Sequence, residues 1–356
     1  MKILHTADMH LGSPLNSKLS GAKVRERSRE LTDTFRKIVN FATREGASAI
    51  IIAGDLFDCE RVSAKIYDEV TGIIEGSKIN FFYLPGNHEG DSFVGSGRTL
   101  PKNLYTFGEE WTYFELEDTV IGGRSLCSPD LFSTYRAHPE KKNIAVLHGE
   151  LRDRSASPAT VGLKDARGVG LDYLALGHYH GYRCERIDER GVAVYCGAPE
   201  CRGFDECGEH GYVVIDTEGD GVTHRFVPSA VRELHIVELD VTGALSQREI
   251  EDGAEGQLSG ISAKDMVRLR LSGKRKIDLN CDTDSLYRRF CHNFYYFEVK
   301  DSTGLEIRAE DYAHDKSLKG EFLRCVLSDE SLTKEERDRI ITCGLYALAG
   351  EALYDK

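Results

Sequence analysis

The sequence predicts a layered α/β domain followed by a smaller α+β domain and terminal helices. Between residues 1 and 228, short apolar runs rich in β-branched and aromatic residues alternate with helical patterns, which is typical of an α/β fold. Near Arg232 the pattern changes to strand-like runs around a helical stretch, and beyond Ser317 it is helical. We therefore predict domains at 1–228 and 232–316 and a helical segment at 317–356.

The apolar runs of the first domain have the length and composition of strands. They cover residues 2–7, 49–53, 79–84, 119–121, 143–147, 171–176, 192–195, 212–215 and 222–226. Blocks of Asp, Asn and His begin just beyond the ends of several runs. In open α/β sheets, sites form outside the carboxyl ends of strands, where loops aim side chains at a shared point. We therefore expect these blocks to converge.

An amphipathic helix is predicted between the first two strands. Apolar and small residues recur there at helical spacing: Val24, Ser28, Leu31, Phe35, Ile38 and Ala42. The other face carries seven Lys and Arg residues, Arg27 among them, against four acidic residues. This excess of positive charge fits either a solvated helix surface or a patch that contacts phosphates.

The second domain is predicted from strand-like runs at 234–241, 266–271 and 294–299. In the helical segment, Thr333 followed by Glu336 resembles a capping box. An apolar stripe follows it at Ile340, Ile341, Leu345, Leu348 and Leu353. The stripe fits either the core of packed helices or a contact surface for a partner.

The composition limits the functional classes. A net charge of −13 over 356 residues argues against a protein that wraps nucleic acid through bulk positive potential. No run approaches the roughly 20 apolar residues of a membrane span, and Asp8 comes before an apolar signal-peptide core could form. The ten cysteines include no Cys-x-x-Cys pair, which favours reduced thiols. We expect a cytoplasmic protein with no membrane contact.

Five blocks of Asp, Asn and His decide the functional prediction. They are Asp8-x-His10, Gly54-Asp55-Leu56-Phe57-Asp58, Gly86-Asn87-His88-Glu89, His148-Gly149 and Gly177-His178-Tyr179-His180. Each block alone is unspecific, but together they offer oxygen and nitrogen donors that suit two Mn²⁺ ions, with Fe or Zn²⁺ as alternatives. A pair of metals can activate a nucleophile and neutralise phosphoryl oxygens in phosphate ester hydrolysis. Asp55 is the natural bridge, because a carboxylate has two oxygens.

These blocks, in this order, resemble the calcineurin-like metallophosphoesterase superfamily. The resemblance implies a four-layer α/β/β/α sandwich. It implies that one metal is held by Asp8, His10, Asp55 and His180, and that the second is held by Asp55, Asn87, His148 and His178. In the same pattern, His88 protonates the leaving group and Asp58 orients the His88 imidazole.

Within that superfamily, residues 5–15, 54–58 and 84–89 resemble the DNA repair exonucleases of the SbcD and YhaO type. Further similarity lies at residues 176–180, 196–199 and 202–204. The resemblance implies DNA as substrate and an SbcC-like, Rad50-like coiled-coil ATPase as partner, both contacted by the C-terminal parts of the chain. Formation of a homodimer is left open.

Two missing arginines favour phosphodiester over phosphomonoester chemistry. Ser/Thr phosphatases of the superfamily carry arginines where this chain has Cys59 and Pro85. A diester has one negative charge fewer than a monoester dianion, so it needs less compensation. Arg61 or Arg124 could partly substitute for them, and Arg202, in the Gly-rich loop after the last ligand, is a further candidate phosphate contact.

We expect a Mn²⁺-dependent phosphodiesterase that acts on DNA ends in DNA repair, as an exonuclease or endonuclease, with 3′-to-5′ direction for the exonuclease. Two alternatives remain. The first is a phosphodiesterase or phosphatase for a small molecule or a protein, motivated by the net negative charge. The second is a non-catalytic scaffold for an ATPase partner, which the complete ligand set weakens.

Overall fold

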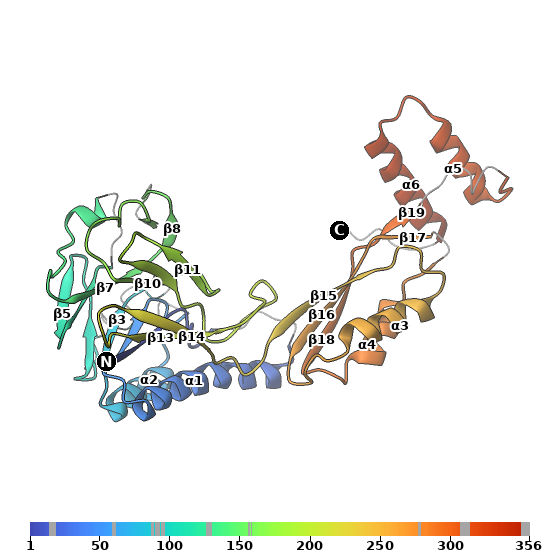
Figure 1. Cartoon of the computed structure of the whole chain (residues 1–356). Coiled ribbons are helices and arrows are strands. Elements are labelled where there is room, and N and C mark those ends of the chain that lie inside the picture. The colour runs from blue at the N-terminus through green and yellow to red at the C-terminus, as the bar shows by residue number, and fades with distance from the viewer. Residues whose placement is uncertain are drawn as a thin grey trace. The chain divides into compact units, whose positions relative to one another are not determined.

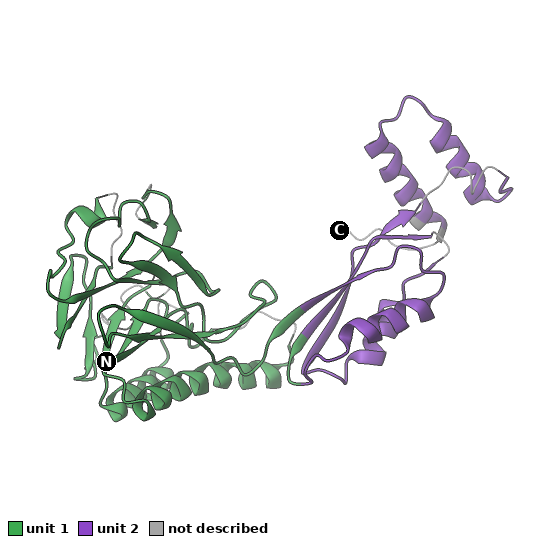
Figure 2. Ribbon diagram, viewed as in Figure 1, with its two compact units in different colours: residues 1–235, 264–266 green, residues 236–263, 267–356 purple. Residues whose placement is uncertain are grey.

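The computed structural model describes residues 1–13, 19–58, 62–86, 89, 93, 97–125, 130–155, 157, 159–276, 279–306 and 314–349. The chain divides into two units, coloured separately in Figure 2. The first contains residues 1–235 and 264–266, and the second contains residues 236–263 and 267–356. No helix among the described residues is long and apolar enough to cross a membrane.

The first sheet of the first unit holds the N-terminal strand at its centre (Figure 1). Its order is β14 (Thr223–Pro228), β13 (Gly211–Asp216), β1 (Lys2–Thr6), β2 (Ala49–Ala53), β3 (Asn80–Leu84) and β4 (Leu104–Thr106). The strands from β1 to β4 are parallel to one another, whereas β13 and β14 join antiparallel. The carboxyl ends of β1 and β2 therefore lie at the same edge.

The second sheet also has six strands. Its order is β11 (Arg183–Arg186), β12 (Val192–Tyr195), β10 (Tyr173–Gly177), β7 (Lys142–His148), β6 (Thr119–Gly123) and β5 (Thr112–Leu116). Its four central strands are parallel, so β7 and β10 also end at one edge. A separate parallel pair follows β7 and consists of β8 (Glu150–Arg152) and β9 (Thr160–Gly162).

Alternating side chains of the strands build two apolar layers. Leu4, Ile50 and Ile52 face α1 (Gly21–Arg44) and α2 (Ala64–Ser77), whereas Ile3 and Ile51 pack between the two sheets. The outer face of the second sheet is covered by η1 (Leu131–Ser133), β9 and loops. The predicted α/β class is confirmed, with η1 and loops where a helical fourth layer was implied, as far as the described residues show.

The predicted amphipathic helix between the first two strands is present as α1, and its predicted apolar face is buried at Leu31, Phe35, Ile38 and Ala42. One charged position departs from the pattern. Arg27 is buried rather than solvated, because its guanidinium pairs with Glu30 and donates to the carbonyl of Cys201.

The second unit is an α+β arrangement. Its sheet has the order β15 (Leu234–Asp240), β16 (Met266–Ser272), β18 (Tyr296–Asp301). Its core includes buried side chains of α3 (Gln247–Leu258) and α4 (Thr283–Phe290). A short parallel pair joins β17 (Lys274–Lys276) to β19 (Gly304–Glu306).

The C-terminal helices α5 (Leu318–Ser328) and α6 (Lys334–Ala349) share a small core of their own. The predicted capping box is present: Glu336 N donates to Thr333 Oγ1 at 3.3 Å, and Thr333 N donates to Glu336 Oε2 at 2.9 Å. The apolar stripe divides, because Ile341 and Leu345 are buried whereas Leu348 is 42% exposed. Of the two interpretations of the stripe, burial in a core of packed helices applies to Leu345. Leu353 lies outside the described residues.

Replacing Leu345 with Asp is expected to unfold the pair α5–α6. The change buries a carboxylate among Leu323, Val326 and Ile341, and deleting a buried Leu side chain alone costs about 2–5 kcal/mol. Hydrogen exchange of α5 and α6 measures the effect. Leu348→Asp on the exposed side of the same helix is the control, and equal protection in both variants would contradict the core assignment.

Candidate metal site

The candidate ligands follow the ends of four strands. Asp8 and Asp55 lie just beyond β1 and β2, the neighbouring parallel strands of the first sheet. His148 ends β7, and His178 follows β10, the neighbouring parallel strands of the second sheet. The two sheets pack face to face, so all four strands deliver their polar ends to one place, as the sequence predicts.

The loops after β1 and β2 are joined by backbone hydrogen bonds. Asp8 N donates to Gly54 O, and His10 N donates to Asp55 O, both at 3.0 Å. Asp8, His10 and Asp55 have φ angles of 51°, 46° and 50°. Residues other than glycine rarely adopt this left-handed conformation, and such strain concentrates at functional sites.

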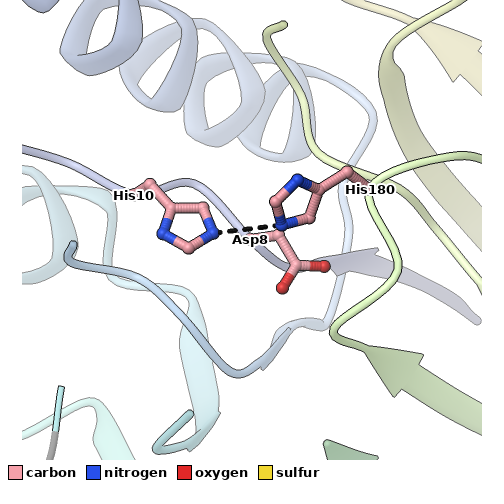
Figure 3. A group of neighbouring side chains, drawn as sticks. All are labelled: Asp8, His10 and His180. Carbon is pink, nitrogen blue, oxygen red and sulfur yellow. Dashed lines mark hydrogen bonds between the residues drawn. The ribbon is translucent and has the colours of Figure 1, made fainter. Parts of the chain in front are cut away.

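Asp8, His10 and His180 form the first cluster (Figure 3). One ligand atom of each lies within 4.8 Å of the others. His10 Nε2 and His180 Nε2 are 3.2 Å apart. Two nitrogens at about 2.0–2.1 Å from one ion and at about a right angle would lie about 3 Å from each other. The observed spacing therefore suits two ligands of one cation.

Asp8, Asp55 and His148 form the second cluster, again with ligand atoms within 4.8 Å of one another. Asp55 Oδ2 lies 3.4 Å from His148 Nε2 and 3.8 Å from His10 Nε2. This carboxylate oxygen therefore stands between the imidazoles of the two clusters. That is the position required of the predicted bridge.

Each clustered imidazole has an oxygen at Nδ1. His10 Nδ1 is 2.8 Å from Asp58 Oδ1, His180 Nδ1 is 2.6 Å from Glu206 Oε1, and His148 Nδ1 is 2.9 Å from the carbonyl oxygen of Ala53. A proton on Nδ1 leaves the lone pair on Nε2, the atom that faces the cluster in all three rings. The hydrogen bonds of His180 and His148 thus select the tautomer that binds a metal, while Asp58 lies at ion-pair distance from the same ring atom of His10.

His178 lies beside these clusters without belonging to either among the described residues. Its backbone N–H donates to both carboxylate oxygens of Asp8, at 2.9 and 3.0 Å. Its imidazole is exposed and packs edge-on against His148, with ring centroids 5.4 Å apart. The backbone of His178 therefore orients Asp8, while metal binding by its ring stays a prediction.

Asn87 and His88 lie outside the described residues, but Gly86, which precedes them, is informative. A Cβ on Gly86 would lie 2.0 Å from Asp55 Oδ1, so only glycine permits this close approach to the predicted bridge. Glu89 stabilises the same region, because its carboxylate accepts hydrogen bonds from Phe57 N, Tyr83 Oη and Gly86 N. Burial raises the pKa of Glu89 to about 7.

The charge balance of the cluster favours a cation. Burial raises the pKa of the Asp8 carboxyl to about 6 and lowers that of the His10 imidazole to about 4. Burial opposes protonation of His148 as well, but its hydrogen bond to Asp55 and the charges of Asp8 and Asp55 raise its pKa to about 9. The raised pKa of His148 reflects the negative charge of these two buried carboxylates. Divalent ions bound to the same oxygens would compensate this charge.

Three predicted site residues have contacts that the sequence did not indicate. Asp58 contacts His10, as described above, and also lies 3.1 Å from the Nη1 atom of Arg202. Arg202 contacts Glu206 as well. The Nε atom of Arg124 donates to the carbonyl of Glu109. Orientation of His88 by Asp58 and phosphate contacts by Arg202 and Arg124 stay predictions.

Sequence reasoning gave no role to Glu89 or Glu206. Glu89 closes the Gly86–Glu89 block, so its place in that block was a signal for it. Glu206 follows Arg202 by four residues in the loop after β12. Nothing local shows that Glu206 reaches His180 across 26 residues of sequence, so only the fold identifies it.

Replacing Gly54 with Ala is expected to disrupt the site and to lower the free energy of unfolding by about 2–4 kcal/mol. Gly54 has a φ of 95°, and its Cβ would lie 2.0 Å from His148 Nδ1. Gly219→Ala is the control, because Gly219 has a φ of 82° but open space around it. Urea unfolding and Mn²⁺ titration measure both effects. Equal behaviour of the two variants would show that the contact with His148 is unimportant.

A sequence profile of the family described as calcineurin-like phosphoesterase matches residues 1–229, which contain every clustered residue. The chain belongs to this family. The metallophosphoesterase is thus a phosphoester hydrolase, and its donor set of carboxylates and imidazoles fits the two-metal site of the family.

Relatives of the metallophosphoesterase align beyond the matched domain. YhaO of Bacillus subtilis, described as an uncharacterized metallophosphoesterase, is 26% identical over 295 residues, covering 77% of this chain and 72% of YhaO. The DNA double-strand break repair protein Mre11 of Sulfurisphaera tokodaii is 25% identical over 300 residues, covering 77% and 74%. The SbcD subunit of the nuclease SbcCD of Staphylococcus epidermidis is 26% identical over 296 residues, covering 70% and 75%.

Proposed function

We propose that this metallophosphoesterase is a Mn²⁺-dependent phosphodiesterase that acts on DNA ends in DNA repair. The observation that carries the proposal is the convergence of Asp8, His10, Asp55, His148 and His180, with the Nε2 atom of each imidazole directed into the cluster. Relatives named as a double-strand break repair protein and as part of a nuclease support DNA as the substrate.

The chain's own residues would prepare the reaction. Two divalent cations bound here would supply an activated water and neutralise the phosphoryl oxygens. Asp58, Glu206 and the carbonyl of Ala53 contact the Nδ1 atoms of His10, His180 and His148 and so fix the orientation of the three rings. His88 is assigned the proton that the departing sugar oxygen needs, because an imidazole can serve as a general acid near neutral pH.

A groove on the first unit supports a polyanionic substrate. It has a volume of about 500 Å³, lies between α1 and α2, and is lined by Arg25, Arg29 and Lys65. Among the described residues, these three cations have no ion-pair partner, whereas the groove's Asp33 and Glu69 are both paired with Arg36, at 2.8 and 2.7 Å. Unneutralised positive charge in a chain of net charge −13 favours phosphates at this groove.

One residue that lines the groove lies beside Gly12, which is two residues after His10 in the chain. A Cβ on Gly12 would lie 3.2 Å from Ile66 Cδ1, and Ile66 lines the groove. A nucleic acid strand held at the metals could therefore place neighbouring phosphates near these cations. The charged face of α1 was predicted to be either a solvated surface or a patch that contacts phosphates, and this arrangement favours the phosphate patch.

A second candidate is a phosphodiesterase or phosphatase for a small molecule or a protein. A cleft of about 360 Å³ opens at His178 and His180, and Arg202, Asp205, Glu206 and Glu209 also line it. Glu206 is paired with Arg202 and His180, so Asp205 and Glu209 are the carboxylates that disfavour a phosphate backbone on this side of the site. A compact substrate with little negative charge would avoid the repulsion.

One assay separates the two candidates. The full chain is incubated with Mn²⁺, Mg²⁺ or Zn²⁺ and with DNA, single- or double-stranded, labelled at the 5′ or 3′ end. Bis-p-nitrophenyl phosphate and p-nitrophenyl phosphate serve as a generic diester and monoester. Metal-dependent shortening of DNA from its 3′ end supports the proposal. Turnover of the generic diester without any cleavage of DNA would favour the second candidate.

The partner belongs to the same proposal. It includes a cytoplasmic location and an SbcC-like ATPase as partner; a relative named as a subunit of the nuclease SbcCD supports the partner. The C-terminal pair α5–α6 is the proposed contact. Since Leu345 is buried, a partner would meet the exposed apolar residues Leu318, Ile340 and Leu348 instead.

A further inference from the structure

Arg202 lies between two carboxylates that each hold an imidazole of the first cluster. Its Nη1 atom donates to Asp58 Oδ1 at 3.1 Å, and its Nη2 atom donates to Glu206 Oε1 at 3.2 Å. Asp58 Oδ1 is 2.8 Å from His10 Nδ1, and Glu206 Oε1 is 2.6 Å from His180 Nδ1. The Nε2 atoms of His10 and His180 are 3.2 Å apart. The contacts among these five side chains therefore close into a ring.

The ring joins loops that are distant in the sequence. His10 follows β1, Asp58 follows β2, His180 follows β10, and the pair Arg202 and Glu206 follows β12. Each carboxylate that orients an imidazole is therefore itself held by the same planar guanidinium, whose rigid fork fixes the direction of its hydrogen bonds. The side chains of Arg202 and Glu206 are mostly buried, with exposures of 20% and 8%.

The contacts of Arg202 leave few hydrogen-bond donors for a substrate. All three nitrogens of its guanidinium donate to carboxylate oxygens, since Nε also donates to Glu206 Oε1, at 3.3 Å. Its backbone N–H donates to Glu206 Oε2 at 2.8 Å. A substrate contact would require the guanidinium to give up these charge-assisted hydrogen bonds.

We propose that Arg202 is a positioning residue that locks His10 and His180 together through Asp58 and Glu206. It does not contact the substrate. The inference rests on the proposed function in one respect, that His10 and His180 are metal ligands. His148 is held instead by the carbonyl of Ala53, so loss of Arg202 weakens one metal position and leaves the other.

The test is a calorimetric titration of the full chain with Mn²⁺ alone. The wild-type protein is expected to bind two ions. Arg202→Ala is expected to keep one at wild-type affinity and to bind the other about 10–100-fold more weakly, as other changes behind metal ligands do. Arg202→Lys should recover part of the loss, because an ammonium keeps the charge but lacks the fork.

Arg190→Ala is the matched control. Arg190 also makes a forked pair in the same unit, with Nε and Nη2 each 2.8 Å from an oxygen of Asp172, and neither residue belongs to the clusters. This variant should bind both ions as the wild type does. The Co²⁺ absorption spectrum, which reports coordination geometry, should change in Arg202→Ala but not in Arg190→Ala.

A double-mutant cycle with Glu206→Gln examines the route of the effect. If Arg202 acts through Glu206, the losses of Mn²⁺ affinity in the two single variants will not add in the double variant. Full additivity would contradict the coupling that the ring implies.

The other outcomes are distinct. Unchanged Mn²⁺ binding in Arg202→Ala, with a raised KM for the generic diester, would show that Arg202 contacts the substrate and would overturn the inference. Equal weakening of both ions with a lower melting temperature would show a merely structural role and would also overturn it. A wild-type chain that binds no Mn²⁺ would contradict the proposed function itself.

Discussion

Replacing Asp55 with Ala is expected to remove both metal ions and with them the hydrolysis. Asp55 Oδ2 stands between His148 Nε2 and His10 Nε2, at 3.4 and 3.8 Å, so its loss removes a donor of the second cluster and the predicted bridge to the first. Charge stabilisation by metals is worth several kcal/mol, and each 1.36 kcal/mol is tenfold in rate. Turnover of the generic diester should therefore fall by about 10³-fold or more. Metal content and turnover are measured on the same sample.

The control for Asp55→Ala is Asp172→Ala. Asp172 is also buried, but its partners are Arg190 and the backbone of Asn143. Its loss should lower stability, because it leaves Arg190 without its forked partner, while metal content and turnover remain. An Asp55→Ala protein that retains both ions would rule out the bridging role.

Replacing His88 with Ala is expected to leave both metals bound and to slow cleavage of DNA by about 10²–10⁴-fold. His88 lies outside the described residues, so this expectation comes from the sequence pattern, in which it is no ligand. Its assigned task is to protonate the departing sugar oxygen, a poor leaving group when charged. The rate of DNA cleavage and the Mn²⁺ content are the measurements.

Comparing two substrates with different leaving groups tests the role of His88 more directly. The p-nitrophenolate ion departs readily without a proton, so His88→Ala should affect bis-p-nitrophenyl phosphate much less than DNA. His138→Ala is the control, because His138 lies outside the ligand blocks. An equal loss on both substrates would mean that His88 does something other than donate a proton to the leaving group.

Central strands were easier to predict than edge strands. The run at 49–53 is β2, and the run at 143–147 lies within β7 (Lys142–His148). These strands are buried on both faces, so their sequences are continuously apolar. The short strands β4, β5 and β11 were missed, and each lies at the edge of a sheet. Edge strands are partly solvated, and their pairing depends on neighbours that local patterns do not reveal.

The burial of Arg27 is a second feature that local sequence patterns do not reveal. Its sequence neighbours place it on a charged helix face, where a basic side chain is normally solvated. The partners that make its burial favourable include the carbonyl of Cys201, 174 residues away. A buried charge needs such partners, and only the packing of α1 against that loop provides them.

The order and chemical type of the candidate ligands could be read from the sequence alone, because donor preference is a property of the side chain and each block follows a recognisable strand. The tertiary structure decided which atom of each imidazole faces the cluster, through Asp58, Glu206 and the carbonyl of Ala53. It also showed that Arg202 contacts two carboxylates, while a phosphate contact by Arg202 stays a prediction. Hydrogen-bond direction depends on distances between distant loops, and those distances exist only once the two sheets have packed.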